Sequence, residues 1–148
     1  MTTALPKPEK RGPKPRKRIA RRRRPNPQSK AARRRAWIKA VNLARKLARL
    51  RDGRCVMAGL YFGCGGVLQG AHIFGVGAYP AIALHEQNIL GLCSGHHRWA
   101  HHHPIEWESF CREWIGDVAY DELRRLAVQT HEKPDPFAYL AERELDVM

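Results

Sequence analysis

The 148-residue sequence has no long hydrophobic run, because no apolar segment approaches the roughly 20 residues that cross a bilayer. The basic N-terminal region is not followed by a hydrophobic segment, so we expect neither a secretory signal nor a membrane partner. A mitochondrial-type presequence is the alternative, but prolines lie among the arginines and no amphipathic pattern is present. We therefore expect a cytoplasmic protein.

Acidic residues are almost absent from the first third of the chain. Residues 1–54 contain 21 Lys and Arg but only two acids, a net charge of +19, whereas residues 55–148 contain six Lys and Arg and 12 acids, a net charge of −6. A basic segment on a mildly acidic body predicts a polyanionic partner, most simply DNA or RNA bound through its phosphates. The alternative is a segment that only improves solubility.

Residues 1–28 are predicted to be a disordered basic arm, because they combine Lys, Arg and Pro with almost no apolar side chains. Residues 29–53 predict a basic amphipathic helix, with Ser29 as N-cap and Gly53 just past its end. Its apolar residues recur with helical spacing and its other surface is basic. The arm and helix together present the candidate nucleic-acid-binding residues Arg21, Arg22, Arg23, Arg24, Arg33, Arg34, Arg35, Lys39, Arg45, Lys46 and Arg49.

Cysteines are few, and three of the four flank a histidine-rich stretch. Cys55, Cys64, Cys93 and His96 form a Cys3His set that is typical of a closed structural zinc site. Cys93 and His96 have the usual two-residue gap, whereas the gap from Cys55 to Cys64 is longer than usual. The alternative is unligated cysteines in a core without metal. The fourth cysteine, Cys111, lies in an apolar helical pattern and is expected to be buried without a ligand.

The histidine-rich stretch at residues 69–103 carries the candidate chemistry. His97 and His101 are four residues apart in a predicted helix, which places both imidazoles on one face for one metal ion. His72 ends a predicted strand and can act as a general base near neutral pH. Asn88 can orient the loop that follows His72 or give an oxygen to the metal.

The elements expected around these residues are α-helical and β-stranded, which predicts a small α+β fold. A strand at 67–74 and a strand at 88–92 are joined by a Gly- and Pro-containing loop, and Ser94 is expected to cap the helix that follows. Further helices are expected at 104–115, from Asp117 onward, and at 137–145. We divide the chain into the arm at 1–28, the helix at 29–53, a domain at 54–130 and a helical tail at 131–148.

The order of these residues resembles that of the HNH (ββα-metal) endonucleases. The pattern is two Cys, then AHI, then N-I-x-x-L-C-x-x-H-H. The stretches GAYPAIALHEQNILGLC and PIEWESF, with WIGDVAYDEL, look like the phage NinG/Rap-type recombination nucleases and related phage proteins. The resemblance covers about residues 36–126.

The resemblance implies a ββα-metal core with flanking helices. It implies catalytic roles for His72 as general base, for Asn88 as the middle HNH residue and for His97 as a metal ligand. His101 resembles a second helix histidine, and His96 takes the place of a second Cys. Many HNH enzymes have a metal ligand immediately before the general base, but this position is Ala71. His97, His101 and Asn88 would then hold the metal, unless His72 is itself a ligand; His85 and Glu86 are spare candidates.

These observations predict an HNH endonuclease that uses Mg, Mn or Zn at its active site, together with a structural Zn, to hydrolyse phosphodiester bonds of DNA. The resemblance extends this to branched recombination intermediates, which a homodimer would suit; the related alternative is a nicking or packaging-associated phage HNH enzyme. If a phage encodes the protein, we expect it in the host cytoplasm. The rival is a noncatalytic zinc-stabilised nucleic-acid-binding protein, and a ribonuclease is a third alternative.

Overall fold

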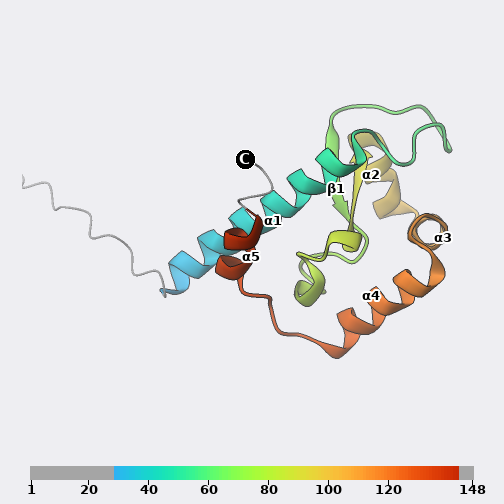
Figure 1. Ribbon diagram of the computed structural model, residues 1–148. Helices are drawn as coiled ribbons and strands as arrows, with labels where there is room; N and C mark the ends of the chain where they lie inside the picture. The colour runs from blue at the N-terminus through green and yellow to red at the C-terminus, as the bar shows by residue number, and fades with distance from the viewer. Residues whose placement is uncertain (1–28, 144–148) are drawn as a thin grey trace, which may run out of the picture.

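The computed structural model describes residues 29–143; residues 1–28 and 144–148 lie outside this part. The predicted disordered arm, with Arg21 to Arg24, therefore lies outside the described residues. The described chain is a small α+β structure of five α-helices and one two-stranded antiparallel sheet (Figure 1), as the sequence predicted. The elements are α1 Lys30–Asp52, β1 Leu68–His72, η1 Pro80–Ile82, η2 Glu86–Asn88, β2 Ile89–Cys93, α2 Ser94–His102, α3 Pro104–Ile115, α4 Asp117–Gln129 and α5 Pro136–Arg143, where η marks a short 3₁₀ turn.

Helix α1 begins and ends where its capping residues predict. The Ser29 hydroxyl accepts a hydrogen bond from the N–H of Ala32, and Gly53 adopts a left-handed conformation whose N–H donates to the carbonyl of Arg49. Both bonds satisfy backbone groups that a helix end leaves unpaired. The buried face consists almost entirely of small residues, namely Ala36, Ala40, Val41, Ala44 and Ala48. A face of small side chains allows a helix to lie close to what it covers.

The sheet meets α1 at a pair of glycines. Gly70 of β1 and Gly91 of β2 are directly opposite each other in the antiparallel register. A Cβ atom on Gly70 would lie 2.7 Å from the Cα of Arg45, and one on Gly91 would lie 3.1 Å from the Cβ of Asp52. The glycines therefore let the helix backbone approach the hairpin more closely than any side chain would allow.

Two hydrophobic clusters lie around this hairpin. The first joins the hairpin to α2, α3, α4 and the segment after α1, and its larger members include Met57, Leu90, Leu92, Trp107 and Phe110. The second joins α1 to Leu84, Ile89 of β2 and Leu140 of α5. Every residue of β2 is buried, and the strand contributes to both clusters. The described part of the predicted 131–148 tail packs against α1 through α5 (Figure 1).

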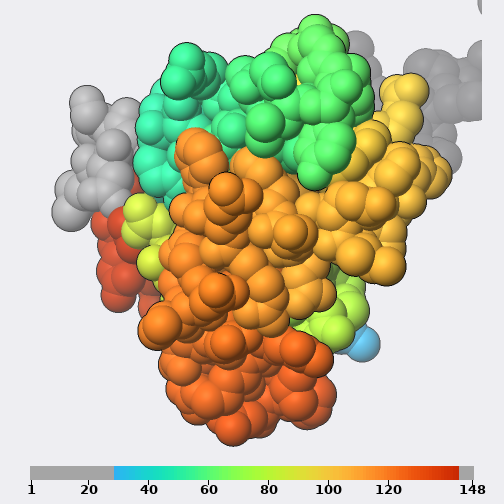
Figure 2. Space-filling model, turned by 90° about the vertical axis from the view of Figure 1, so that its right-hand side faces the viewer, coloured from blue at the N-terminus to red at the C-terminus, as the bar shows by residue number. Residues whose placement is uncertain are grey.

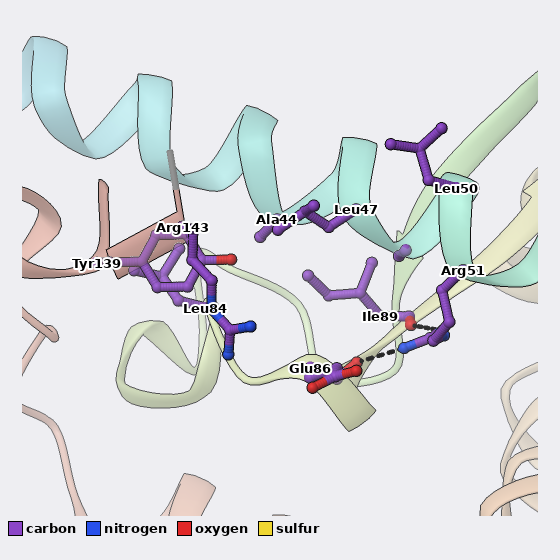
Figure 3. A pocket seen from close by; sticks show the side chains of 10 residues that line it. Ala44, Leu47, Leu50, Arg51, Leu84, Glu86, Ile89, Tyr139 and Arg143 are labelled. Carbon is purple, nitrogen blue, oxygen red and sulfur yellow. Dashed lines mark hydrogen bonds between the residues drawn. The ribbon is translucent and has the colours of Figure 1, made fainter. Parts of the chain in front are cut away.

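An arginine fastens the end of α1 to the start of β2. Arg51 donates hydrogen bonds to the carbonyl oxygens of Glu86 and Ile89, at 3.0 and 2.7 Å, and pairs with Asp52. Asp52 in turn accepts a hydrogen bond of 2.6 Å from the N–H of Gly91. A pocket of about 260 Å³ lies beside Arg51, between α1 and α5 (Figure 3).

The observed elements differ from the predicted ones at several boundaries. The strands are shorter or shifted, at 68–72 and 89–93, and Asn88 lies in the turn η2 instead of opening a strand. The cap of α2 is Cys93, not Ser94, because the Cys93 sulfur accepts from the N–H of His96. Gly116, not Asp117, occupies the N-cap position of α4. Within residues 29–143, no helix combines the length and apolar character that a membrane span requires.

Candidate metal centre and histidine cluster

Cys55, Cys64, Cys93 and His96 come together as a group that can hold a metal ion such as zinc. Their four potential ligand atoms all lie within 4.8 Å of one another. The Nδ1 atom of His96 lies 3.5 Å from the Cys55 sulfur, 3.8 Å from that of Cys64 and 3.1 Å from that of Cys93. Tetrahedral zinc with ordinary Zn–S and Zn–N bonds would place such atoms about 3.6 Å apart. The spacing therefore fits a Cys3His zinc site, as the sequence predicted.

The ring of His96 is oriented for ligation through Nδ1. Its Nε2 lies 2.9 Å from the carbonyl oxygen of Leu60, which can only accept, so the proton is on Nε2. Nδ1 then carries the lone pair that faces the three sulfurs. Phe62 stacks on the same ring, with centroids 4.4 Å apart. These two contacts fix the tautomer and the ring plane, as partners of metal-bound histidines usually do.

The cap position of Cys93 favours its thiolate. Burial opposes ionisation, but N–H groups of His96 and Gly65 point at the sulfur and lower the pKa of Cys93 to about 6. A thiolate is the form of cysteine that binds metals. Cys111 is buried outside the cluster, in agreement with its predicted role as a core residue.

The long gap between Cys55 and Cys64 is taken up by a folded loop, which we call the knuckle (residues 55–64). Hydrogen bonds from Ala58 to Cys55 and from Leu60 to Met57 form successive turns. Met57 is fully buried and belongs to the first hydrophobic cluster, which ties the loop to the core. Gly59 and Tyr61 adopt positive φ angles of 83° and 60°, which reverse the chain toward Cys64. A ten-residue loop can therefore bring both cysteines to the site without the usual short spacing.

His72 lies at the end of β1, and one of its ring nitrogens forms a hydrogen bond with the backbone. Its Nε2 is 2.9 Å from the carbonyl oxygen of Ala83, so Nε2 carries the proton and Nδ1 the lone pair. Burial is the largest cause of a lowered pKa for His72, and the charges of Arg45 and His97 lower it further. The imidazole is therefore held neutral, with a nitrogen that can accept a proton.

Asn88 is fully buried beneath the loop that follows His72. Its side-chain oxygen accepts from the N–H of Phe74 at 2.8 Å, and its amide donates to the carbonyls of Phe74 and Ile82 at 3.1 and 3.0 Å. Of the two roles considered for Asn88, these contacts match that of orienting the loop. The side-chain oxygen already has a partner in the backbone.

His97 and His101 lie one helical turn apart on α2. Their ring centroids are 4.9 Å apart. The Nδ1 of His97 is 2.8 Å from the side-chain oxygen of Gln69, so the proton is on Nδ1 and the lone pair on Nε2. Burial and the charges of His101 and Arg45 lower the pKa of His97. His97 is thus held in the neutral form that a metal requires.

Arg45 of α1 acts on the same histidines. Its backbone lies against Gly70 of β1, and its positive charge contributes to the lowered pKa of both His72 and His97. The Nε atom of Arg45 is buried and has no hydrogen-bond partner in the structure. This buried donor without a partner is an exception, because most buried polar groups are hydrogen-bonded.

The position before His72 offers no ligand. Ala71 is 1% exposed and belongs to the first hydrophobic cluster. Within residues 29–143, the Cys3His group is the only set of three or more Cys, His, Asp or Glu side chains arranged for one metal ion. His97 and His101 are therefore two candidate ligands without a third from these residue types. His85 and Glu86 are exposed, and Nδ1 of His85 accepts from the N–H of Gln87.

The predicted nucleic-acid-binding residues of α1 are distributed over its outer surface. Most are exposed, namely Arg33, Arg34, Arg35, Lys39 and Lys46, whereas Arg45 and Arg49 are half-buried. Asp52 at the end of the helix is its only acidic residue. The surface that the helix presents to solvent is therefore mostly basic, although Ile38 and Leu50 are also exposed on it.

Two contacts of the histidine cluster were not predicted from the sequence. Gln69 of β1 holds His97 of α2, which lies 28 residues further along the chain, and no local pattern signals this contact. Arg45 was predicted to bind nucleic acid but not to influence the pKa of the histidines. Its position follows from the contact between α1 and Gly70, which no local pattern reveals.

Comparisons of the chain with protein-family models, with curated proteins and with solved structures give no match. The HNH resemblance therefore remains a prediction.

Proposed function

We propose that this protein is a metal-dependent endonuclease that hydrolyses phosphodiester bonds of DNA in the manner of an HNH enzyme. The observation that carries the proposal is that β1 brings three groups together: the strand ends in His72, its Gln69 hydrogen-bonds to His97 of α2, and its Gly70 lies against the backbone of Arg45. A neutral base, a metal-binding imidazole and a cation are the groups that hydrolysis of a phosphodiester needs.

The side chains divide these tasks among them. Nδ1 of His72 would take a proton from the attacking water, while Ala83 holds the ring in place. Arg45 would bind a phosphate oxygen and offset its charge. His97, oriented by Gln69, and His101 would hold the metal ion. When bound, the ion would act as a Lewis acid and stabilise the leaving oxygen.

The ligand atoms point to a particular class of metal. Two imidazoles without a carboxylate suit zinc, nickel or similar transition metals, whereas Mg prefers oxygen ligands. We therefore expect activity with Mn, Ni or Zn to exceed that with Mg. The structural zinc of the Cys3His group would be separate from this ion.

The experiment is cleavage of labelled linear duplex and four-way-junction DNA with each of these metals. Wild-type protein is compared with His72→Ala and with a chelator control. His131→Ala is a matched control, because His131 is exposed and belongs to neither metal set. We expect cutting that His72→Ala abolishes and His131→Ala retains, and preference for the junction would support a branched substrate and a dimer.

The second candidate is a noncatalytic zinc-stabilised nucleic-acid-binding protein. The buried Ala71 and the absence of a third Cys, His, Asp or Glu ligand beside His97 and His101 in the described chain favour it. Under this alternative the wild-type protein binds both DNAs but cuts neither with any of the metals. RNA cleavage in place of DNA cleavage would indicate a ribonuclease.

A further inference from the structure

The tip of the knuckle exposes three large apolar side chains in succession. Leu60, Tyr61 and Phe62 are 42%, 61% and 41% exposed. The backbone of Leu60 and the ring of Phe62 hold His96, so both have a role at the metal centre. The side chain of Tyr61 makes no contribution there.

Tyr61 has an unusual backbone conformation. Within residues 29–143, it is the only residue other than glycine with a positive φ angle, at 60°. This conformation costs an ordinary residue roughly 1–2 kcal/mol. A glycine at this position would avoid that cost, yet the residue is a tyrosine. We therefore look to the aromatic ring for the reason.

The ring of Tyr61 continues a stack of aromatic side chains along α2. Its centroid lies 4.2 Å from that of Trp99, and Trp99 stacks on His103 with centroids 4.7 Å apart and planes 12° from parallel. Trp99 also packs against the first hydrophobic cluster, and Nδ1 of His103 lies 2.9 Å from the Trp99 carbonyl oxygen. We call Tyr61, Trp99 and His103 the aromatic ladder. It is anchored at Trp99 and open to solvent at both of its ends.

The chain segment that contains Trp99 and His103 of the ladder carries no acidic residue. No acidic residue occurs between Glu86 and Glu106, a segment that includes all of α2. Successive helix residues are about 100° apart, so the exposed Arg98 and His102 form a ridge between the His97 face and the Trp99 face. Figure 2 shows the knuckle, in green, directly beside the α2 residues in yellow. A phosphate chain lying on the ridge would have the metal-binding histidines on one side and the ladder on the other.

We propose that the aromatic ladder is a stacking site for an unpaired nucleobase. Flat, exposed aromatic rings beside basic side chains are the combination with which proteins hold single-stranded nucleic acid. A paired base inside a duplex has no free face, so the site would select DNA with unpaired or displaced bases. The inference shares with the proposed function only the assumption of a nucleic-acid ligand and does not require cleavage.

The test compares binding of three fluorescently labelled 12-mers by anisotropy, with full-length protein and no added divalent metal. The oligonucleotides are single-stranded dT, a fully abasic strand with the same phosphates, and a blunt duplex. The central variant is Tyr61→Gly, because glycine removes the ring and suits the positive φ angle. We expect Tyr61→Gly to weaken binding of the dT strand about 5- to 100-fold, the usual effect of losing one base stack. Binding of the abasic strand and of the duplex should change less than about twofold, since phosphate contacts are retained.

Two further variants separate stacking from other effects. Tyr61→Phe keeps the ring and should bind the dT strand like the wild-type protein. Tyr61→Leu keeps an apolar side chain without a flat face and should behave like Tyr61→Gly. Zinc content equal to that of the wild-type protein would show that each variant retains the knuckle.

Several outcomes would overturn the proposal. An unchanged affinity of Tyr61→Gly for the dT strand, or equal losses for the dT and abasic strands, would show that no base stacks on Tyr61. Binding of the dT strand by Tyr61→Leu with wild-type affinity would show that an apolar side chain is sufficient there and that no base stacks on a flat ring. DNA cleavage is not part of the readout, so an inactive nuclease would leave the test of the ladder intact.

Discussion

The backbone of Arg45 lies directly against Gly70, so closely that a Cβ atom on the glycine would be 2.7 Å from the Arg45 Cα. This contact fixes the height of α1 above the hairpin. It also fixes the place on α1 from which the charge of Arg45 lowers the pKa of His72 and His97. One glycine therefore links the packing of the fold to the charge at the candidate active site.

Gly70→Ala is expected to destabilise the protein, because the added methyl group would force α1 away from β1. Overpacking of this kind costs about 1–3 kcal/mol. Urea unfolding followed by circular dichroism measures the loss. Gly77→Ala is the matched control, since Gly77 has open space around it and is expected to change stability by less than about 0.5 kcal/mol. Equal stabilities for the two variants would contradict the close contact.

Replacing a metal-site cysteine should remove the bound metal. We expect one zinc per chain in the purified protein, measured by elemental analysis, and its loss in Cys55→Ser together with a lower unfolding temperature. Cys111→Ala provides the control, because Cys111 is equally buried but lies outside the cluster. A Cys111 variant that lost zinc, or a Cys55 variant that kept it, would refute the assignment of the ligands.

Asn88→Ala is expected to destabilise the protein strongly, because it removes three hydrogen bonds at a fully buried position. The backbone groups of Phe74 and Ile82 would lose their partners, for a loss of about 2–4 kcal/mol. The neighbouring Gln87→Ala, at an exposed position, should change the free energy of unfolding very little. Similar unfolding curves for both variants would show that Asn88 does not hold the loop.

The pKa of His72 should lie below 6.5, because burial and the charges of Arg45 and His97 disfavour its protonated form. A general base must be neutral, so cleavage should increase with pH and reach half of its maximal rate below pH 6.5. The unfolded chain takes up this proton near pH 6.5, so the contribution of His72 to stability decreases as the pH falls below that value. NMR titration of the His72 ring measures the pKa directly, and a value above 6.5 would be inconsistent with the buried site.

Arg45→Gln should raise the pKa of both His72 and His97, because it removes a positive charge that acts on each of them. The same variant should weaken cleavage by more than it weakens DNA binding. Lys46→Gln removes an equal charge from the neighbouring exposed position and should leave both histidine pKa values unchanged. If both variants raised the pKa values of His72 and His97 equally, the cause would be the overall charge of the protein and not the position of Arg45.

Much of the helical structure could be predicted from the sequence, because its signals are local. Ser29, Gly53 and Gly116 mark helix boundaries through their own conformations and hydrogen bonds. The Cys3His group was also predictable, since the chemistry of four such side chains is specific even when their spacing is irregular.

The relationships that position the histidine cluster were harder to predict. The turns η1 and η2 are too short to have a periodic pattern, so Asn88 was expected in a strand. The positive φ angle of Tyr61 is an exception to residue preferences. The contacts of Gln69 with His97 and of Gly70 with Arg45 join distant parts of the chain, and nothing in the neighbouring residues indicates them.

Strand β2 belongs to both hydrophobic clusters, and all five of its residues are buried. Unfolding of either hydrophobic cluster would therefore expose the same short strand to solvent. Because of this shared strand, the metal-bearing half and the α1–α5 half should unfold as one cooperative unit. The amides of Leu90 and Leu92 should then exchange with solvent only when the whole molecule opens.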